Sequence, residues 1–178
     1  MSPEQSIHKI LEALQFAAHK HRDQRRKDIE ASPYINHPIA LANVLWREAA
    51  VHEADVICAA LLHDTVEDTN TTKEELAERV GKKVAAIVME VTDDKTLRKP
   101  ERKRLQIEHA AHISRKAKLV KLADKISNLR DVAASPPREW PLKRRRKYFD
   151  WAKQVVDRMR GVHPVLERLF DEAYKGRP

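Results

Sequence analysis

Apolar residues recur every three to four positions along most of the chain, and this spacing predicts helices rather than strands. Over residues 1–20 the repeat forms one face of an amphipathic helix, made by Ile7, Ile10, Leu11, Leu14, Ala17 and Ala18. The same spacing predicts further helices over residues 38–50, 56–68, 73–80, 82–91, 101–112, 116–132, 142–160 and 164–174. We therefore expect an all-α fold, a compact multi-helix bundle that occupies residues 1–178 as a single domain.

Short sequence signals predict where several of these helices begin. Pro38 is expected at the first position of its helix, where its missing N–H has no intrahelical partner to lose. Asp55 is suited to cap the apolar run that follows it, and we expect that run to continue as one helix to Asp68. Thr72 followed by Glu75 forms a capping box for the next helix. The charged segment before Pro38 is expected to be a surface loop.

Composition supports the same fold class and limits the possible functions. The 178 residues include only three glycines, which argues against an all-β fold and against a glycine-rich phosphate loop. The single cysteine, Cys58, excludes an internal disulfide and a cysteine-based zinc site. No apolar stretch approaches the roughly 20 residues that a membrane span needs, and the first residues lack an apolar signal segment. We therefore expect a cytoplasmic protein without a membrane partner.

The formal net charge of +8 points to a polyanionic partner, such as nucleic acid, a phosphorylated small molecule or an anionic surface. Two basic runs, residues 98–104 and 143–147, could form a nucleic-acid surface. However, aromatic residues make up only 5% of the chain and offer few platforms for base stacking, and no recognition motif is present. The sequence disfavours nucleic acid and favours a small phosphorylated ligand.

Four potential metal ligands stand where the helical pattern calls for apolar residues or gives way to a loop: His37, His63, Asp64 and Asp124. His63 and Asp64 end a buried apolar run, and Asp124 lies within the apolar stripe of its helix. Burying such groups without a partner costs free energy, and a bound cation would satisfy them. Two imidazoles and two carboxylates suit Mn²⁺, Fe²⁺, Zn²⁺ or Co²⁺.

Ordinary structural roles are also open to these residues. His37 could cap a helix, and Asp124 could form an ion pair with Lys121 or Lys125 on a helix surface. The histidine and aspartate that end the buried run give the strongest signal, because adjacent buried polar residues are seldom without partners.

A second set of polar side chains follows the potential ligands at helical spacing. Glu67 and Asp68 lie four residues after His63 and Asp64, so in a continuous helix they project towards the same face. They are candidate acid or base groups, although a carboxylate pair near a helix end can also simply favour the helix dipole. Asn128 lies four residues after the last potential ligand and could orient a substrate.

The order of these residues resembles that of the HD phosphohydrolase superfamily, in which a histidine is followed by a His-Asp pair and then by an aspartate. The likeness extends to RRKD at 25–28, PYINHP at 33–38, AALLHDTVEDT at 59–69, EVTDDKT at 90–96 and KLVKLADKISNLRD at 118–131. These stretches resemble the hydrolase domain of the RelA/SpoT alarmone enzymes, and most closely the stand-alone small alarmone hydrolases. The resemblance covers nearly the whole chain.

This resemblance implies an HD-domain fold and an Mn²⁺-dependent hydrolase that removes the 3′-pyrophosphate of ppGpp or pppGpp and returns GDP or GTP. It implies that His37, His63, Asp64 and Asp124 hold the metal, and that Glu67 and Asp68 position or deprotonate the attacking water. It also suggests substrate contacts by Arg26, Lys27, Tyr34, Asn36, Lys95, Lys99, Asn128, Arg144 and Tyr148.

Other functions remain open at this stage. Stand-alone members of the resembled family are also linked with removal of the 2′-phosphate of NADPH, and the wider superfamily includes nucleoside monophosphatases. A catalytically silent HD domain that senses a nucleotide, or a basic module that binds nucleic acid or nucleotides, would be non-enzymatic. The products separate the enzymes, because a monophosphatase releases orthophosphate whereas an alarmone hydrolase releases pyrophosphate.

Overall fold

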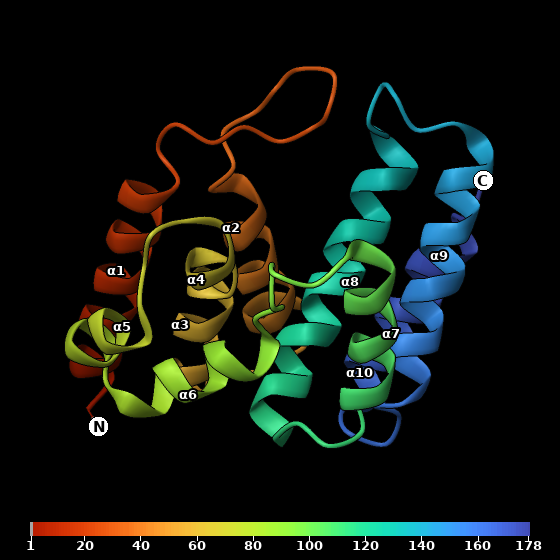
Figure 1. Cartoon of the computed structure of the whole chain (residues 1–178). Coiled ribbons are helices and arrows are strands. Elements are labelled where there is room, and N and C mark those ends of the chain that lie inside the picture. Colours follow the sequence, from red (N-terminus) through yellow and green to blue (C-terminus); the bar gives the residue numbers. More distant parts are fainter. Residues whose placement is uncertain (1) are drawn as a thin grey trace.

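The computed structural model describes residues 2–178 and is built from helices (Figure 1). These are α1 (Pro3–Lys20), α2 (Asn36–Asn43), the π-helical turn η1 (Val44–Glu48), α3 (Ala54–Leu62), α4 (Thr65–Asp68), α5 (Lys73–Val80), α6 (Lys82–Val91), α7 (Lys99–His109), α8 (Arg115–Ala134), α9 (Leu142–Asp157) and α10 (Pro164–Lys175). Within residues 2–178 no strand forms, and an isolated bridge joins Arg25 to Pro33. The predicted all-α class is confirmed.

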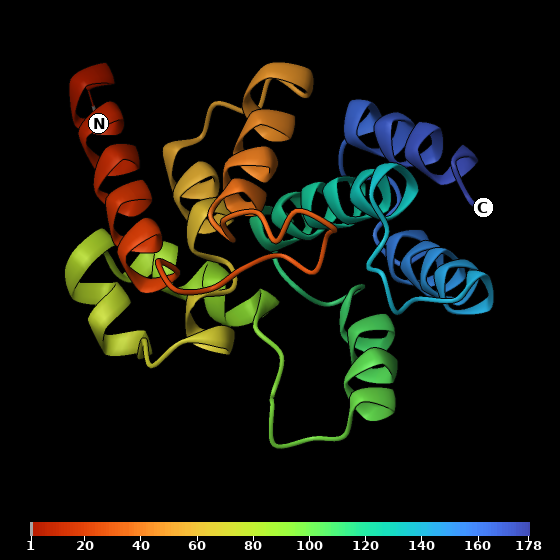
Figure 2. The same ribbon diagram turned by 90° about the horizontal axis from the view of Figure 1, so that it is seen from above.

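Helices α3 and α8 form the centre of the molecule. Helix α3 packs against α1, α2, α6 and α8, while α8 also contacts α2, α6, α9 and α10. Seen from above, α1 lies at one side and α9 and α10 at the other, with α8 between them (Figure 2). Every residue of α3 except Asp55 is buried, as expected for a helix that is covered on all sides. Among residues 2–178, no helix is both long and apolar enough to cross a membrane.

Two helix starts are fixed by side-chain caps, one of which was predicted. Ser2 Oγ accepts a hydrogen bond from Gln5 N at 3.2 Å, and Gln5 Oε1 accepts one from Ser2 N at 2.8 Å, which fixes the start of α1. Thr72 Oγ1 accepts from Glu75 N at 3.1 Å and caps α5, which is one half of the predicted capping box. The Glu75 carboxylate pairs with Lys20 at 2.9 Å, so it ties α5 to α1.

Two other predicted starts were wrong. Helix α2 begins at Asn36, two residues before Pro38, which fits there because the first-turn amides have no intrahelical acceptor. Asp55 does not cap α3, since Glu53 stands at the capping position. The Asp55 carboxylate instead lies 2.7 Å from Lys9 Nζ and joins α3 to α1, because a cation from a neighbouring helix is the stronger partner.

The single helix predicted to run to Asp68 is divided in the structure. Helix α3 ends at Leu62, and α4 begins only at Thr65. At the division Thr65 Oγ1 donates to the Leu62 carbonyl at 2.7 Å, and His63 Nδ1 lies 2.9 Å from the Ala60 carbonyl. Side chains thus take carbonyls that a continuous helix would pair with its own amides. The break falls at the His-Asp pair singled out in the sequence.

Candidate metal centre and adjoining pocket

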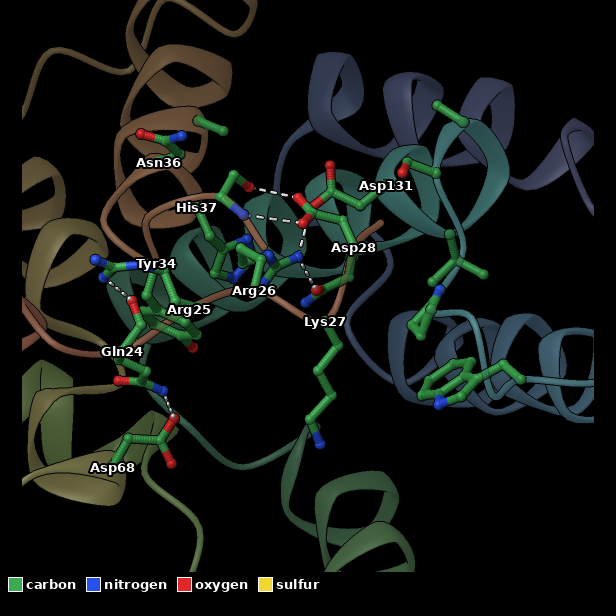
Figure 3. Close-up of a pocket in the computed structure, with 18 of the residues that line it drawn as sticks. Gln24, Arg25, Arg26, Lys27, Asp28, Tyr34, Asn36, His37, Asp68 and Asp131 are labelled. Carbon is green, nitrogen blue, oxygen red and sulfur yellow. Dashed lines mark hydrogen bonds and ion pairs between the residues drawn. The ribbon is translucent and has the colours of Figure 1, made fainter. Parts of the chain in front are cut away.

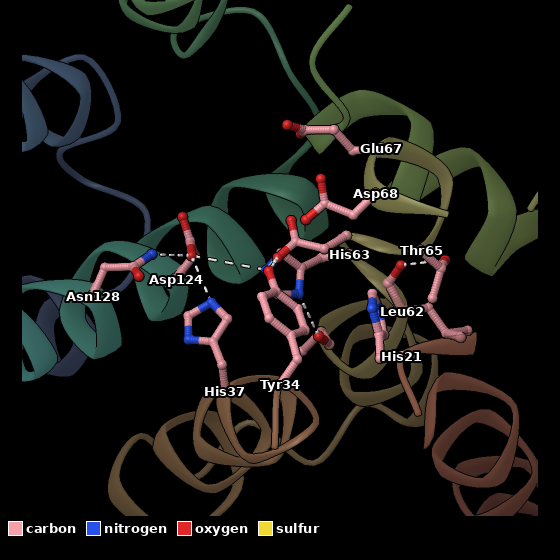
Figure 4. A network of polar contacts seen from close by, with 12 residues as sticks. His21, Tyr34, His37, Leu62, His63, Thr65, Glu67, Asp68, Asp124 and Asn128 are labelled. Atoms are coloured by element: carbon pink, nitrogen blue, oxygen red, sulfur yellow. Dashed lines mark hydrogen bonds and ion pairs between the residues drawn. The ribbon is translucent and has the colours of Figure 1, made fainter. Parts of the chain in front are cut away.

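Three of the four predicted metal ligands come together where α2, α3 and α8 meet. His37 in α2, His63 after α3 and Asp124 in α8 each offer a ligand atom, and these atoms all lie within 4.8 Å of one another. Asp124 Oδ1 is 3.3 Å from His37 Nε2 and 3.8 Å from His63 Nε2 (Figure 4). Both imidazoles are buried. The contacts of α2 and α8 with α3 therefore assemble the cluster.

Asp64, the fourth predicted ligand, adjoins this cluster. Its Oδ2 lies 2.9 Å from His63 Nε2 and also accepts a hydrogen bond from the Tyr34 hydroxyl. It does not belong to the three-residue group that meets the 4.8 Å spacing. The carboxylates of Asp64 and Asp124 therefore both face His63 Nε2. Asp64 does so from the break between α3 and α4, and Asp124 does so from α8.

An imidazole nitrogen of the centre lacks a hydrogen bond in the described part of the chain. Among residues 2–178, His63 Nε2 is buried and has no hydrogen-bond partner, although Asp64 Oδ2 lies close to it. A buried imidazole nitrogen that faces two carboxylate oxygens suits a divalent cation, which would accept all three donor atoms. This mixed nitrogen and oxygen set fits Mn²⁺, Fe²⁺, Zn²⁺ or Co²⁺. The residues present therefore fit a metal.

Burial and mutual charge shift the pKa of each titratable group in the centre. Burial lowers the pKa of His37, which keeps this imidazole neutral. Burial opposes protonation of His63, but the charges of Asp64 and Asp124 outweigh it and raise the pKa of His63 to about 9. Burial also disfavours ionisation of the two aspartates, yet nearby cationic groups hold the pKa of each carboxyl well below its usual range. Both carboxylates are thus ionised at neutral pH.

Asp124 combines the metal-centre position with a buried ion pair. Lys125 Nζ lies 2.9 Å from Asp124 Oδ2, and the amide of Asn128 donates to Asp124 Oδ1 at 2.5 Å. The Lys125 ammonium also sits 4.5 Å from the centroid of the Trp151 ring. The ion pair between Asp124 and Lys125 that the sequence left open does form. It is buried rather than on the helix surface, because the Lys125 side chain is only 5% exposed. The pair holds Asp124 in place beside the imidazoles.

Glu67 lies close to the centre with its carboxylate partly buried. Glu67 Oε2 accepts a hydrogen bond from Asp93 N at 3.2 Å, and Oε1 is 3.6 Å from Arg102 and 3.8 Å from Lys95. Burial, together with the charges of Asp64 and Asp93, raises the pKa of Glu67 to about 7. A carboxylate with this pKa can both accept and donate a proton near neutral pH.

Asp68 has both of its oxygens engaged by neighbouring side chains. Its Oδ2 accepts from Gln24 Nε2 at 3.2 Å, and its Oδ1 pairs with Lys95. Asp68 lies in the wall of a pocket (Figure 3), and Glu67 lines the same pocket. The two acids therefore face the same space, as the sequence suggested, although the helix that was to align them is broken.

A pocket of about 650 Å³ opens beside the metal centre. Its wall includes His37, both acids of α4 and most of the predicted substrate contacts, namely Arg26, Lys27, Tyr34, Asn36, Lys95, Asn128 and Tyr148. The loop between α1 and α2 forms one side, where Arg26 N donates to Ser32 O at 2.9 Å and Asp28 accepts from Ser32 N at 3.0 Å. Arg26 lies 2.5 Å from Asp131 and 5.8 Å from the centroid of the Tyr34 ring.

Two predicted substrate contacts lie outside this wall. Lys99 and Arg144 line a neighbouring cavity of about 290 Å³, which shares Trp140 and Tyr148 with the larger pocket. The Arg144 guanidinium stacks 4.4 Å from the centroid of the Trp140 ring. Burial and nearby cations, Arg144 first among them, lower the pKa of Lys99. The structure thus divides the predicted contacts between two adjoining spaces.

Gln24 and Trp140 are among the residues at the site that were not predicted from the sequence. Gln24 holds Asp68, and Trp140 stands between the two cavities. Both lie in loops, where no helical periodicity marks an inward-facing position. The only available signals were the nearness of Gln24 to the basic residues of its loop and a large aromatic side chain in a proline-rich break.

The comparisons with known proteins agree with this geometry. Residues 13–149 match the model of the HD domain family. The guanosine-3′,5′-bis(diphosphate) 3′-pyrophosphohydrolase MESH1 of Xenopus tropicalis is 56% identical over 165 residues, covering 93% of this chain and 92% of that protein. MESH1 of Homo sapiens is 54% identical over 168 residues, with 94% of each chain covered.

Two further similarities extend this finding. The bifunctional (p)ppGpp synthase/hydrolase SpoT of Escherichia coli is 33% identical over 188 aligned positions, which cover 98% of this chain and 26% of SpoT. A solved structure, described as a metazoan ortholog of SpoT that hydrolyses ppGpp and plays a role in starvation responses, superposes with a TM-score of 0.92. It is 51% identical, and 95% of each chain is covered. This chain therefore belongs to the HD domain family and, within it, to the group of the MESH1 proteins.

Proposed function

We propose that this chain is a metal-dependent guanosine-3′,5′-bis(diphosphate) 3′-pyrophosphohydrolase, which converts ppGpp or pppGpp to GDP or GTP and pyrophosphate. One observation carries the proposal: the buried cluster of His37, His63 and Asp124 lies beside a pocket lined by cationic side chains. The chain is also more than half identical, over nearly its full length, to proteins that carry this activity in their names.

Four side chains would hold the metal in this proposal: His37, His63, Asp64 and Asp124. Their mixture of imidazole and carboxylate supports Mn²⁺, and the single cysteine is buried and takes no part. When bound, a divalent cation supplies Lewis acidity, which lowers the pKa of a water molecule and offsets phosphate charge. We place the reaction in the cytoplasm, where a free buried thiol such as Cys58 persists.

The side chains of α4 would handle the water. The reaction adds water across the bond between the ribose O3′ and its phosphorus, so one proton must leave the attacking oxygen. Glu67 is suited to accept this proton, because burial and neighbouring acids raise its pKa to about 7. Asp68 would orient the water, since its own carboxylate is held by Gln24 and Lys95.

The rim of the pocket would bind the nucleotide. Arg26 and Lys27 lie on the loop between α1 and α2, and a guanidinium there can contact phosphate oxygens or stack on a base. Asn128 lies between Asp124 and Arg26 and would face the ribose. Lys99 and Arg144, in the adjoining cavity, would bind phosphates that extend beyond the main pocket.

The test is incubation of metal-free protein with ppGpp, with and without Mn²⁺, followed by separation of the nucleotides and assays for pyrophosphate and orthophosphate. Manganese-dependent formation of GDP and pyrophosphate in equal amounts would support the proposal. NADPH and nucleoside monophosphates are run beside ppGpp. Release of orthophosphate from these substrates, with ppGpp left intact, would overturn it in favour of a phosphatase. Loss of activity in Asp124→Asn would tie the reaction to the metal centre.

A further inference from the structure

A buried histidine outside the metal centre is linked to one of the acids of the pocket. His21, at the end of α1, is only 2% exposed, and its Nδ1 lies 2.6 Å from Gln24 Oε1. The amide of Gln24 in turn donates from Nε2 to Asp68 Oδ2 at 3.2 Å (Figure 3). A continuous path of hydrogen bonds therefore leads from the core of the protein to a pocket carboxylate.

This path fixes which nitrogen of His21 carries a hydrogen. A carboxylate only accepts hydrogen bonds, so the Gln24 group that faces Asp68 must be the NH₂. The carbonyl oxygen of Gln24 then faces His21, and the imidazole must donate to it from Nδ1. The remaining nitrogen, His21 Nε2, is buried and without a hydrogen-bond partner among residues 2–178. His21 is thus held as the Nδ1–H tautomer.

The imidazole itself has little freedom to turn. Its ring packs against the Tyr34 ring, with centroids 4.8 Å apart and planes inclined by 35°. The Tyr34 hydroxyl in turn donates a hydrogen bond to Asp64. Helix α4 by contrast is only four residues long, so it gives Asp68 little rigidity of its own. The orientation of Asp68 therefore depends on contacts from outside its helix.

We propose that His21 and Gln24 are a pair of positioning residues that hold Asp68 in the orientation needed for hydrolysis. Gln24 occupies one carboxylate oxygen, and Lys95 occupies the other, so the carboxylate is fixed from both sides. His21 acts through Gln24, since it prevents the amide from rotating. This inference rests on the proposed function, because it assigns the pair a part in that same reaction.

The experiment combines kinetics with a double-mutant cycle. Gln24→Met keeps the length of the side chain but removes both hydrogen bonds, and we expect kcat for ppGpp to fall about tenfold while KM and metal content stay within twofold. In an Asp68→Asn background the same substitution should cost no further activity, because Gln24 acts through Asp68. Asp23→Asn is the control, since the Asp23 side chain is 88% exposed and lies in the same loop.

Substitutions of His21 test the inner end of the path. His21→Asn retains an N–H close to the place of Nδ1, whereas His21→Phe retains only the ring. We expect His21→Asn to keep more than half of the wild-type kcat and His21→Phe to match Gln24→Met. Circular dichroism and thermal unfolding confirm that each variant is folded. If His21→Phe does not fold, the Gln24 variants and the spectroscopy described next still decide the matter.

A measurement independent of activity is ¹⁵N NMR of the histidine rings, with the His21 signals assigned from the His21→Asn variant. The Nδ1–H tautomer is expected in the wild type, and the Nε2–H tautomer would overturn the proposal. Additive losses in the double-mutant cycle would overturn it as well. Should the wild type leave ppGpp intact, the proposed function fails, and a crystal structure of Gln24→Met decides the positioning role alone: Asp68 unmoved would refute it.

Discussion

The metal centre and the basic rim of the pocket, which includes Arg26 and Lys95, differ in how their charged groups are paired. In the centre, two ionised carboxylates face buried imidazoles, and His63 Nε2 has no hydrogen-bond partner among residues 2–178. On the rim, cations already have anionic partners, as Arg26 has in Asp131 and Lys95 in Asp68. The centre therefore offers donor atoms that suit a cation, whereas in the proposed reaction the rim would exchange its existing partners for a substrate.

This difference predicts how each region responds to mutation. A buried site with few donor atoms loses its ligand when one donor is removed, so its response is nearly all-or-none. Exposed ion pairs contribute little individually, so the rim should respond in small steps. The predictions below test this contrast, beginning with the centre.

The largest effect is expected from Asp124→Ala, which removes a metal-centre carboxylate and leaves the Lys125 ammonium buried without its partner. Bound Mn²⁺, measured by elemental analysis, should be lost, and kcat should fall by about 10³-fold or more because the metal supplies several kcal/mol of stabilisation. The exposed Asp23→Asn variant should retain both. An Asp124→Ala protein that kept its metal and its turnover would remove this residue from the centre.

The second effect concerns Glu67→Gln, which should retain the metal and lose turnover by about 10²–10⁴-fold, as expected for loss of a general base. The wild-type rate should rise with pH, since Glu67 must be ionised to accept a proton and its pKa lies at about 7. A bound cation would shift this rise in rate, the acid limb of the pH profile, to lower pH. The variant should lack the limb, and a pH profile of kcat/KM that is identical in both proteins would assign the proton to another group.

The same substitution should stabilise the metal-free protein. Burial raises the pKa of Glu67 from 4.5 to about 7, so the stability that its neutral form provides at low pH is lost as the pH rises through 7. At pH 8 Glu67→Gln should therefore raise the free energy of unfolding by about 3 kcal/mol, whereas at pH 4 the two proteins should be alike. Urea unfolding in the presence of a chelator measures both, and equal stability at pH 8 would contradict the burial argument.

On the rim, Arg26→Met should raise KM for ppGpp about tenfold, which corresponds to loss of a charge-assisted hydrogen bond, and leave kcat within twofold. Steady-state kinetics at several salt concentrations test this expectation. The metal content serves as the internal control, since the side-chain partners of Arg26 are Asn128 and Asp131. A fall in kcat as large as that of Glu67→Gln would break the contrast between rim and centre.

The smallest effect is expected from Asp131→Asn, and it should have the opposite sign. The Asp131 side chain is 48% exposed and pairs with Arg26, so in the proposed reaction it would compete with substrate for the guanidinium. Removing its charge should lower KM by about two- to threefold, in keeping with the modest strength of exposed ion pairs. Fluorescence titration with ppGpp under non-turnover conditions gives the affinity. An increase in the dissociation constant would show that Asp131 positions Arg26 rather than competing for it.

The sequence predicted the parts of the site that depend on burial and periodicity. His63 and Asp124 were singled out because polar groups interrupt apolar runs, and the structure places both in the cluster with His37. The helices were also predicted closely, because their apolar stripes are regular. The break at His63 was missed, since it depends on local hydrogen bonds from a histidine and from Thr65 to backbone carbonyls.

Contacts between loops and between distant helices were harder to foresee. Lys99 and Arg144 share a cavity next to the pocket because of how α7 packs on α9, which no local pattern records. Gln24 reaches Asp68 across 44 positions of sequence, and the loop that carries it has no repeat that marks an inward face. Hydrophobic periodicity identifies what is buried, but it does not identify which buried groups meet.

The origin of the metal cluster in α2, α3 and α8 has a consequence during synthesis of the chain. His37 leaves the ribosome early, whereas Asp124 follows only after most of the protein has been made. A nascent chain that ends before α8 carries the basic loop and both histidines but lacks this carboxylate. Since α8 also packs against α3, the same event brings Asp124 to the cluster and joins α8 to α3. We therefore expect the chain to bind its metal only after α8 has been made, and a product truncated before α8 to lack hydrolase activity.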